Sequence, residues 1–306
     1  MRNYILVLLV LFTFQIVIAF TLYFQDATGQ ADSLSHKLLT LNENDIVRVA
    51  IKQDDAELTI VNKEGKWVFK EHQNIPIEAH KINVIESELL PLKVSWPITQ
   101  TQGSHTRFKV SDESYNKQIT FTSADGNMET IFLGDSPEFK QVYARIKGQD
   151  NVYSIPFSSF KLTANLTDWF SKSLLAVSEI SEVKSSTLSL KKNEKGWELE
   201  SDKQKMNNEL IDENLINTYV EKLNALKVSD IAELSLTSSE TISVKTVSGY
   251  SYTYEFAKQG DNYYISRNDF THWFELSKPQ YEDIALLQFD KFLLKESEEQ
   301  EEIISE

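Results

Sequence analysis

The 306-residue sequence has no cysteine, nine glycines and six prolines. Without cysteine the chain forms no disulfide framework and no thiolate metal site, and it has no cysteine nucleophile. The few glycines form neither a Gly-x-Gly-x-x-Gly nor a Gly-Lys-Ser/Thr motif, which argues against a nucleotide-binding fold. A Gly-x-Ser-x-Gly nucleophile elbow is also missing, and this argues against a serine hydrolase.

Positive charge is scarce relative to negative charge, because 31 basic residues face 46 acidic ones and the formal net charge is −15. Residues 295–306 contribute six acids and one base, a composition that predicts an acidic disordered tail. The acidic excess of the rest argues against nucleic acid or anionic lipid headgroups as ligands, since both require clustered Lys and Arg. We therefore expect no nucleic-acid partner.

The N-terminus is the one long apolar run. Residues 3–25 carry no charge, and about 21 apolar residues at roughly 1.5 Å each span a bilayer as a helix. This pattern predicts a transmembrane anchor at residues 1–25, followed by a polar stalk at residues 26–37. Arg2 precedes the run, so the positive-inside rule places the N-terminus in the cytoplasm and the body outside the inner membrane. A cleaved signal peptide, which would release a soluble ligand-binding protein, is the competing interpretation.

Two segments of the chain repeat one another at a distance of 130 residues. Residues 58–69 and 188–199 each contain an alternating strand, a polar turn and a second strand with Trp67 or Trp197 near its start. The offset is 134 between Leu92 and Leu226, and it falls to 123 between Ile119 and Ile242. These offsets predict two tandem repeats, at residues 38–165 and 166–294.

The hydrophobic pattern within each repeat predicts an α+β fold. Apolar residues alternate through several hairpin-sized segments, which favours antiparallel strands. The apolar residues of 82–92 and 215–226 instead recur at helical spacing, and short closing helices are expected near residues 156–162 and 279–287. Each repeat is thus predicted to be an antiparallel sheet with one amphipathic helix and a short closing helix.

No residue pattern points to a cofactor, a metal or a catalytic group. The five histidines have no metal-binding spacing: His36, His72, His80, His105 and His272. Trp67 and Trp197 occupy equivalent strand positions, which predicts core packing in both repeats. Trp169, at the junction of the repeats, and Trp273 are candidates for a partner surface. His105 and Asp135 are further candidates, because they belong to the 100–106 loop and the 133–135 turn, which the repeats do not share.

The order of these signals resembles a bacterial membrane-anchored family, domain of unknown function 4340. The resemblance covers residues 38–294 and rests on the Asp-Ile-x-x-Val-x-Ile strand at 45–51, the Gly-Lys-Trp hairpin at 65–67, the Leu-Gly strand end at 133–134 and the strands after it. Members are often encoded beside ABC-2-type transporter subunits, so the resemblance implies an accessory role outside the membrane. It carries over no catalytic residue. The second repeat has Phe256-Ala257 where the first has Leu-Gly.

The sequence and the resemblance together lead to one functional expectation. We expect a non-enzymatic single-pass membrane protein whose body is an accessory or scaffold component of an envelope complex, with an ABC-type export complex as the expected partner. The alternative is an extracytoplasmic hydrolase or glycan-modifying enzyme with a site between the repeats.

Overall fold

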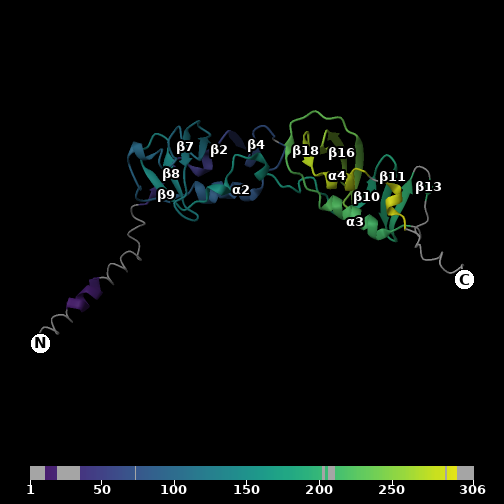
Figure 1. Cartoon of the computed structure of the whole chain (residues 1–306), viewed down its shortest axis with the longest axis horizontal. Helices are drawn as coiled ribbons and strands as arrows, with labels where there is room; N and C mark the ends of the chain where they lie inside the picture. The colour runs from purple at the N-terminus through teal and green to yellow at the C-terminus, as the bar shows by residue number, and fades with distance from the viewer. Residues whose placement is uncertain are drawn as a thin grey trace. The chain divides into compact units, whose positions relative to one another are not determined.

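The computed structural model describes residues 11–18, 35–72, 74–201, 204–205, 211–286 and 288–294 (Figure 1). The chain divides into two compact units. Unit 1 consists of Met1–Glu71 and Ile77–Leu166, and unit 2 consists of His72–Pro76 and Thr167–Glu306. Each unit is built around one large antiparallel sheet.

The sheet of unit 1 has seven strands in the order β4-β3-β2-β6-β7-β8-β9. Their bounds are β2 Ile46–Gln53, β3 Ala56–Lys63, β4 Lys66–Phe69, β6 Lys117–Ser123, β7 Met128–Leu133, β8 Val142–Ile146 and β9 Val152–Ile155. A separate two-stranded ladder joins β1 (His36–Lys37) to β5 (Lys93–Val94). The core lies on one face of the large sheet, where Val49, Ile119 and Phe121 are fully buried.

The sheet of unit 2 has nine strands in the order β13-β12-β11-β10-β15-β16-β17-β18-β14. Their bounds are β10 Ile180–Lys184, β11 Leu188–Asn193, β12 Gly196–Ser201, β13 Gln204–Lys205, β14 Ile231–Ala232, β15 Glu240–Thr246, β16 Ser251–Gln259, β17 Asn262–Arg267 and β18 Trp273–Leu276. Val183, Leu190 and Phe256 are fully buried on its inner face.

The two sheets share their central strand order. Strands β4-β3-β2-β6-β7-β8-β9 of unit 1 correspond one by one to β12-β11-β10-β15-β16-β17-β18 of unit 2, with antiparallel pairing throughout. The match extends to the sheet edge: a bridge joins Thr99 to Val152 at β9, as β14 pairs with β18 in unit 2. The duplication seen in the sequence is therefore a duplication of topology.

Each repeated tryptophan attaches its hairpin to the helical segment that follows. The indole N–H of Trp67 donates to Glu86 Oε1 at 2.9 Å, and that of Trp197 donates to Asn217 Oδ1 at 3.0 Å. Trp197 is buried at 3% exposure, which agrees with the predicted core role, whereas Trp67 is half-buried. Equivalent positions thus make equivalent contacts with unequal burial.

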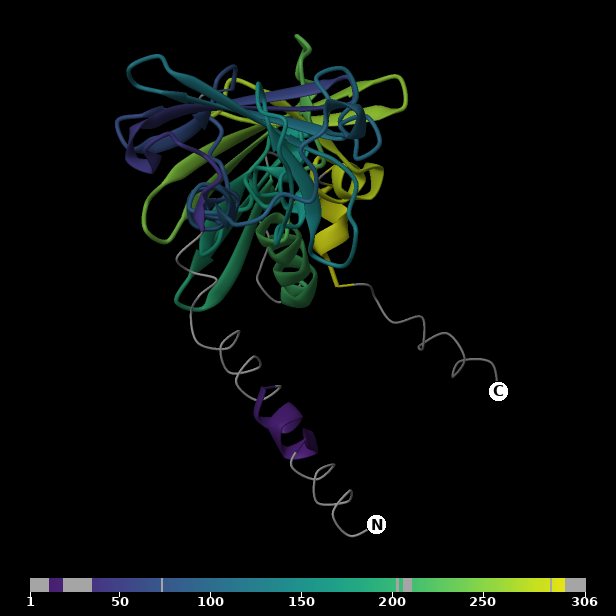
Figure 2. The same ribbon diagram turned by 90° about the vertical axis from the view of Figure 1, so that its left-hand side faces the viewer.

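The α+β prediction is wrong, because the fold is mostly β. The described residues form three sheets and four short α-helices, which are residues 11–18, α2 Ala79–Asn83, α3 Glu213–Asn224 and α4 Lys278–Ile284. In place of the predicted helix of the first repeat stands the five-residue helix α2, which continues as the π-helix η2, Val84–Leu89. Its predicted closing helix is only the 3₁₀ turn η4, Ser159–Lys161. In unit 2, α3 and α4 lie side by side (Figure 2), joined by an ion pair of Lys222 and Asp283 at 3.0 Å.

The predicted membrane-spanning helix is also corrected. Among the described residues no helix is both long and apolar enough to cross a bilayer. Within the predicted anchor only residues 11–18 are described, and they are helical. The rest of the anchor, most of the predicted stalk and the predicted acidic tail at 295–306 lie outside the described residues.

Candidate functional site

Unit 1 contains a cavity of about 460 Å³ at one end of strands β2, β6 and β7. Its wall combines Gln53 and Lys117 from adjacent strands with Asp135 and Ser136 from the segment after β7, and the η4 segment closes it with Ser159 and Phe160. Phe160 is 84% exposed at this site. The volume lies in the range of pockets that hold small ligands, roughly 300–1,000 Å³.

Lys117 is the buried charge of this cavity. Strand β6 alternates between buried and partly exposed residues, so Lys117 points to the same face as the fully buried Ile119 and Phe121. The ammonium donates hydrogen bonds to the carbonyl oxygens of Ser159, at 2.5 Å, and Leu162, and it thereby holds the η4 segment against the sheet. Burial, and after it the positive charge of Lys81, lowers the pKa of Lys117 to about 8.

Gln53 lies beside Lys117. The register that pairs Lys52 with Gln118 continues to bring Gln53 opposite Lys117 on the same face of the sheet, and both side chains line the cavity. The Oε1 atom of Gln53 is buried and has no hydrogen-bond partner among the described residues. Buried polar atoms in folded proteins are almost always hydrogen-bonded, so an unpaired acceptor in a cavity wall marks a place for a donor.

Contacts of its side chain and of its backbone fix Asp135 at the rim. Its Oδ1 accepts from Asn116 Nδ2 at 2.8 Å and lies 3.8 Å from Lys109 Nζ, while its backbone N–H donates to Phe108 O at 3.2 Å. The preceding Gly134 allows this approach, because a Cβ there would overlap the carbonyl oxygen of Phe108. The predicted candidate Asp135 therefore lies in the cavity wall, in a conformation that requires glycine before it.

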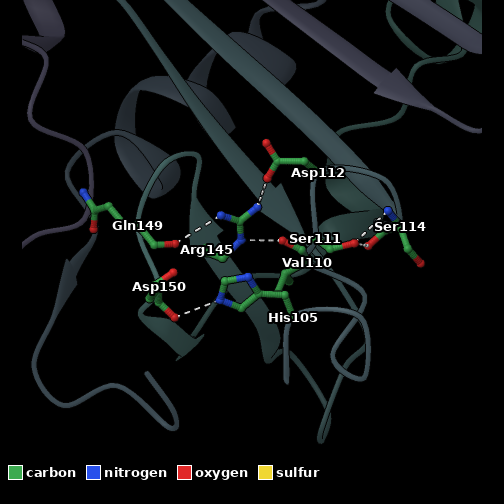
Figure 3. A network of polar contacts seen from close by, with 8 residues as sticks. All are labelled: His105, Val110, Ser111, Asp112, Ser114, Arg145, Gln149 and Asp150. Carbon is green, nitrogen blue, oxygen red and sulfur yellow. Dashed lines mark hydrogen bonds and ion pairs between the residues drawn. The ribbon is translucent and has the colours of Figure 1, made fainter. Parts of the chain in front are cut away.

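The loop that approaches Gly134 belongs to unit 1 alone. The offset between the repeats falls from 134 to 123 across this loop, so the first repeat carries eleven additional residues here. Buried Arg145 holds the loop (Figure 3): its guanidinium donates to Val110 O at 2.6 Å and Gln149 O at 3.1 Å and forms an ion pair with Asp112. His105, the second candidate, is 7% exposed and its Nε2 lies 3.0 Å from Asp150 O. His105 thus lies inside the loop, apart from the residues that line the cavity.

The remaining two candidates lie in unit 2. Trp169 is fully buried. Trp273 is partly buried and packs on a cluster of Ala232, Ala257 and Tyr264. Of the four candidates, only Asp135 is among the residues that line the cavity.

No group of His, Asp and Glu among the described residues is arranged to hold a metal ion. His72 and His272, both in unit 2, come closest: Nδ1 of His72 lies 3.0 Å from Nε2 of His272. The Glu233 carboxylate lies 3.6 Å from Nε2 of His72, on the other edge of that ring. These three groups form a chain of contacts and have no common centre.

Lys117 and Gln53 were not among the predicted site residues. The sequence contained one signal for Lys117. In residues 117–121 polar and apolar residues alternate, and Lys117 falls on the same side as the apolar Ile119 and Phe121. A charged residue on the inward face of a strand is uncommon and needs an explanation. Gln53 carried no such signal, since its importance depends on the register between two strands that are separated in sequence.

Among the described residues, the second repeat differs from the first at key positions of this site. β15 begins with Glu240 where β6 begins with Lys117, and Ala257 stands where unit 1 has Gly134. A second, smaller cavity of about 230 Å³ in unit 2 is lined by residues of α3 and of the segments around and after α4. The Lys117 cavity is therefore a property of one copy of the duplicated fold.

The comparisons with known proteins agree with the resemblance seen in the sequence. The family model described as Domain of unknown function (DUF4340) matches residues 67–248, which is more than half of the chain. The match begins at the repeated Trp67 and includes Lys117, Gly134 and Asp135. No curated protein and no solved structure matches the chain. The chain belongs to the family of the domain of unknown function DUF4340.

Proposed function

We propose that the protein is a non-enzymatic accessory component of an envelope complex, and that unit 1 recognises a partner at the Lys117 cavity. The observation that carries the proposal is a cavity whose walls are fixed by a sheet and whose Gln53 Oε1 is unpaired. Two N–H groups of Lys117 are used to hold backbone carbonyls, so this nitrogen is engaged in structure and binding more than in nucleophilic attack. An ABC-type export complex is the proposed partner, and that step rests on family resemblance.

Site-specific photo-crosslinking in cells tests this proposal. A photoreactive phenylalanine analogue replaces Phe160, which is 84% exposed at the cavity, and in a matched control it replaces Tyr250, which is 67% exposed on unit 2. We expect the Phe160 variant alone to give a discrete adduct, identified by mass spectrometry as an envelope transport protein. Identical adducts from both positions, or none from Phe160, would contradict the proposal.

The proposal also places the body outside the cytoplasm, and the absence of cysteine makes this measurable. Met128 is 72% exposed in unit 1, so Met128→Cys creates a single accessible thiol in an otherwise cysteine-free chain. We expect a membrane-impermeant maleimide to label this variant in intact spheroplasts as completely as after lysis. Labelling only after lysis would place the body in the cytoplasm.

A further inference from the structure

We propose that the Lys117 cavity binds the free carboxyl terminus of a peptide chain, with the carboxylate on Lys117 and the last amide N–H on Gln53 Oε1. The inference rests on the proposed function and names the chemistry of the partner segment. Capture of a terminal carboxylate is an established mode of peptide recognition, and here side chains of two adjacent strands would perform it.

The ammonium of Lys117 has more hydrogen-bond donors than the two for which the structure shows partners. An ammonium has three N–H donors and no acceptor. Two donors are used by the carbonyl oxygens of Ser159 and Leu162. One donor remains for a ligand, and the residue lies in the wall of the cavity.

The charge of Lys117 has no counter-charge in an ion pair among the described residues. Lys117 is 4% exposed, and no carboxylate among the described residues forms an ion pair with it. The charge of Lys81 opposes it further. Buried charges are normally paired, because an ion that is removed from water loses its hydration. A ligand carboxylate would supply the charge that the protein does not.

Two carboxylates do line the same cavity, and they set its selectivity. Asp135 is already engaged by Asn116 and Lys109 at the rim. Asp54 is exposed, at the turn between β2 and β3 with a φ of 51°. These charges disfavour small multivalent anions, which would approach both, and favour a single carboxylate directed at Lys117.

Beside Lys117, Gln53 presents an acceptor without a hydrogen-bond partner among the described residues. Gln53 Oε1 needs a donor, and a carboxylate alone cannot provide one. A peptide terminus carries an amide N–H two bonds from the carboxylate carbon, and Gln53 and Lys117 occupy opposed positions with Cβ atoms about 5 Å apart in such pairs. The exposed ring of Phe160 lies at the same cavity for the terminal side chain.

Calorimetric titration of the purified full chain tests the inference. The probe is the dipeptide N-acetyl-Ala-Phe with a free carboxyl end, and the paired probe is the same dipeptide as its C-terminal amide. We expect the amide to bind about tenfold more weakly or worse, because it cannot pair with a buried charge. Equal binding of the two probes would overturn the inference.

The decisive variant is Gln53→Glu. It places a carboxylate opposite Lys117, so it supplies the missing counter-charge from within and removes the need for a ligand. Because Gln53 Oε1 has no partner to lose, the fold should tolerate the change. We expect binding of the free acid to fall about tenfold or more, whereas Gln118→Glu, the neighbouring change on the opposite face of β6, should leave it within about twofold. Unchanged binding in Gln53→Glu would refute the site.

Lys117→Met serves as a second variant, with circular dichroism as its folding check, because it also removes the hydrogen bonds to the η4 segment. If Phe160 crosslinks an envelope protein while free acid and amide bind alike, the inference fails and the proposed function stands. If the free acid binds but no crosslink forms, the proposed function fails and the inference stands.

Discussion

Unit 1 and unit 2 have the same central strand order, yet they differ at residues that form the Lys117 cavity of unit 1. Lys117, Gly134 and the loop around His105 belong to the first copy, and Glu240 and Ala257 stand at the corresponding positions of the second. Charge differs as well: residues 35–166 carry 15 basic and 17 acidic side chains, and residues 167–294 carry 14 and 21.

The comparison shows which features of the fold the duplication preserves. Both copies keep the hairpins, the indole hydrogen bond to the following helical segment and the edge pairing at β9 or β18. These features bury apolar area and satisfy backbone groups, so any copy needs them. The cavity needs none of them to change, because its wall is formed by the strand ends, the turn at Gly134 and the η4 segment.

The largest expected effect comes from the repeated tryptophans and tests whether the copies depend equally on them. Trp197→Ala should cost about 3–5 kcal/mol of unfolding free energy, because the indole is buried at 3% exposure. Trp67→Ala should cost about 1–2 kcal/mol, since less apolar area is lost from a half-buried ring. Urea unfolding of the full chain, followed by pulse-labelling hydrogen exchange of peptides from each sheet, measures the two separately. Equal costs would show that exposure does not distinguish the hairpins.

An exchange of the residues at 134 and 257 tests the origin of the difference. Gly134→Ala should destabilise unit 1 by about 2–3 kcal/mol, because the added methyl would overlap Phe108 O and lie 2.8 Å from Lys109 O. The reverse change, Ala257→Gly, should cost unit 2 only about 1 kcal/mol through backbone entropy. If Gly134→Ala is as stable as wild type under the same unfolding assay, the loop does not pack against this glycine.

A smaller effect is the opposite response of the two units to alkaline pH. Burial lowers the pKa of Lys117 to about 8 in the folded chain, from an ordinary value of 10.5. Between these two values the unfolded state binds more protons than the folded state, so unit 1 should gain stability as pH rises from 8 to 10.5. Burial raises the pKa of Tyr254 to about 12 and also raises the pKa of Tyr219, so unit 2 should lose stability above pH 10. Each effect is on the order of 1 kcal/mol after solvent screening.

The same pulse-labelling assay, with unfolding at several pH values and the pulse at one fixed pH, measures these responses. Lys117→Met should abolish the gain in unit 1, and Tyr254→Phe should reduce the loss in unit 2. A parallel response of both units in the wild-type chain would contradict the assignment of these groups.

The sequence predicted individual hairpins better than it predicted the proportion of helix and strand in the fold. Alternation identified the Trp hairpins, since period two reports directly on a strand with one buried face. Helical spacing at residues 82–92 did not give a regular helix, because the segment becomes π-helical at Val84 and Pro91 follows its end. Strand order lies beyond such patterns, because pairs such as β2 with β6 join residues that are far apart in the chain.

Of the three residues Asp135, Lys117 and Gln53 in the cavity wall, the sequence had singled out only Asp135. Asp135 was selected because the repeats differ there, and it lies in the cavity wall. Lys117 required attention to which face of its strand it occupies, and Gln53 required the register between β2 and β6. Trp169 was selected as a junction residue, yet it is fully buried, because the apolar area of an indole outweighs its place between the repeats.

The most direct test of a ligand site confined to unit 1 is an NMR titration of the Lys117 side-chain amine with and without N-acetyl-Ala-Phe. The titratable groups around it are Lys81, Asp54 and Asp135, the last beside Lys109. We expect a pKa of about 8 for Lys117 in the free protein and a higher pKa when the free acid is bound, with no change for the amide. An ordinary lysine pKa in the free protein, or one that the free acid leaves unchanged, would contradict it.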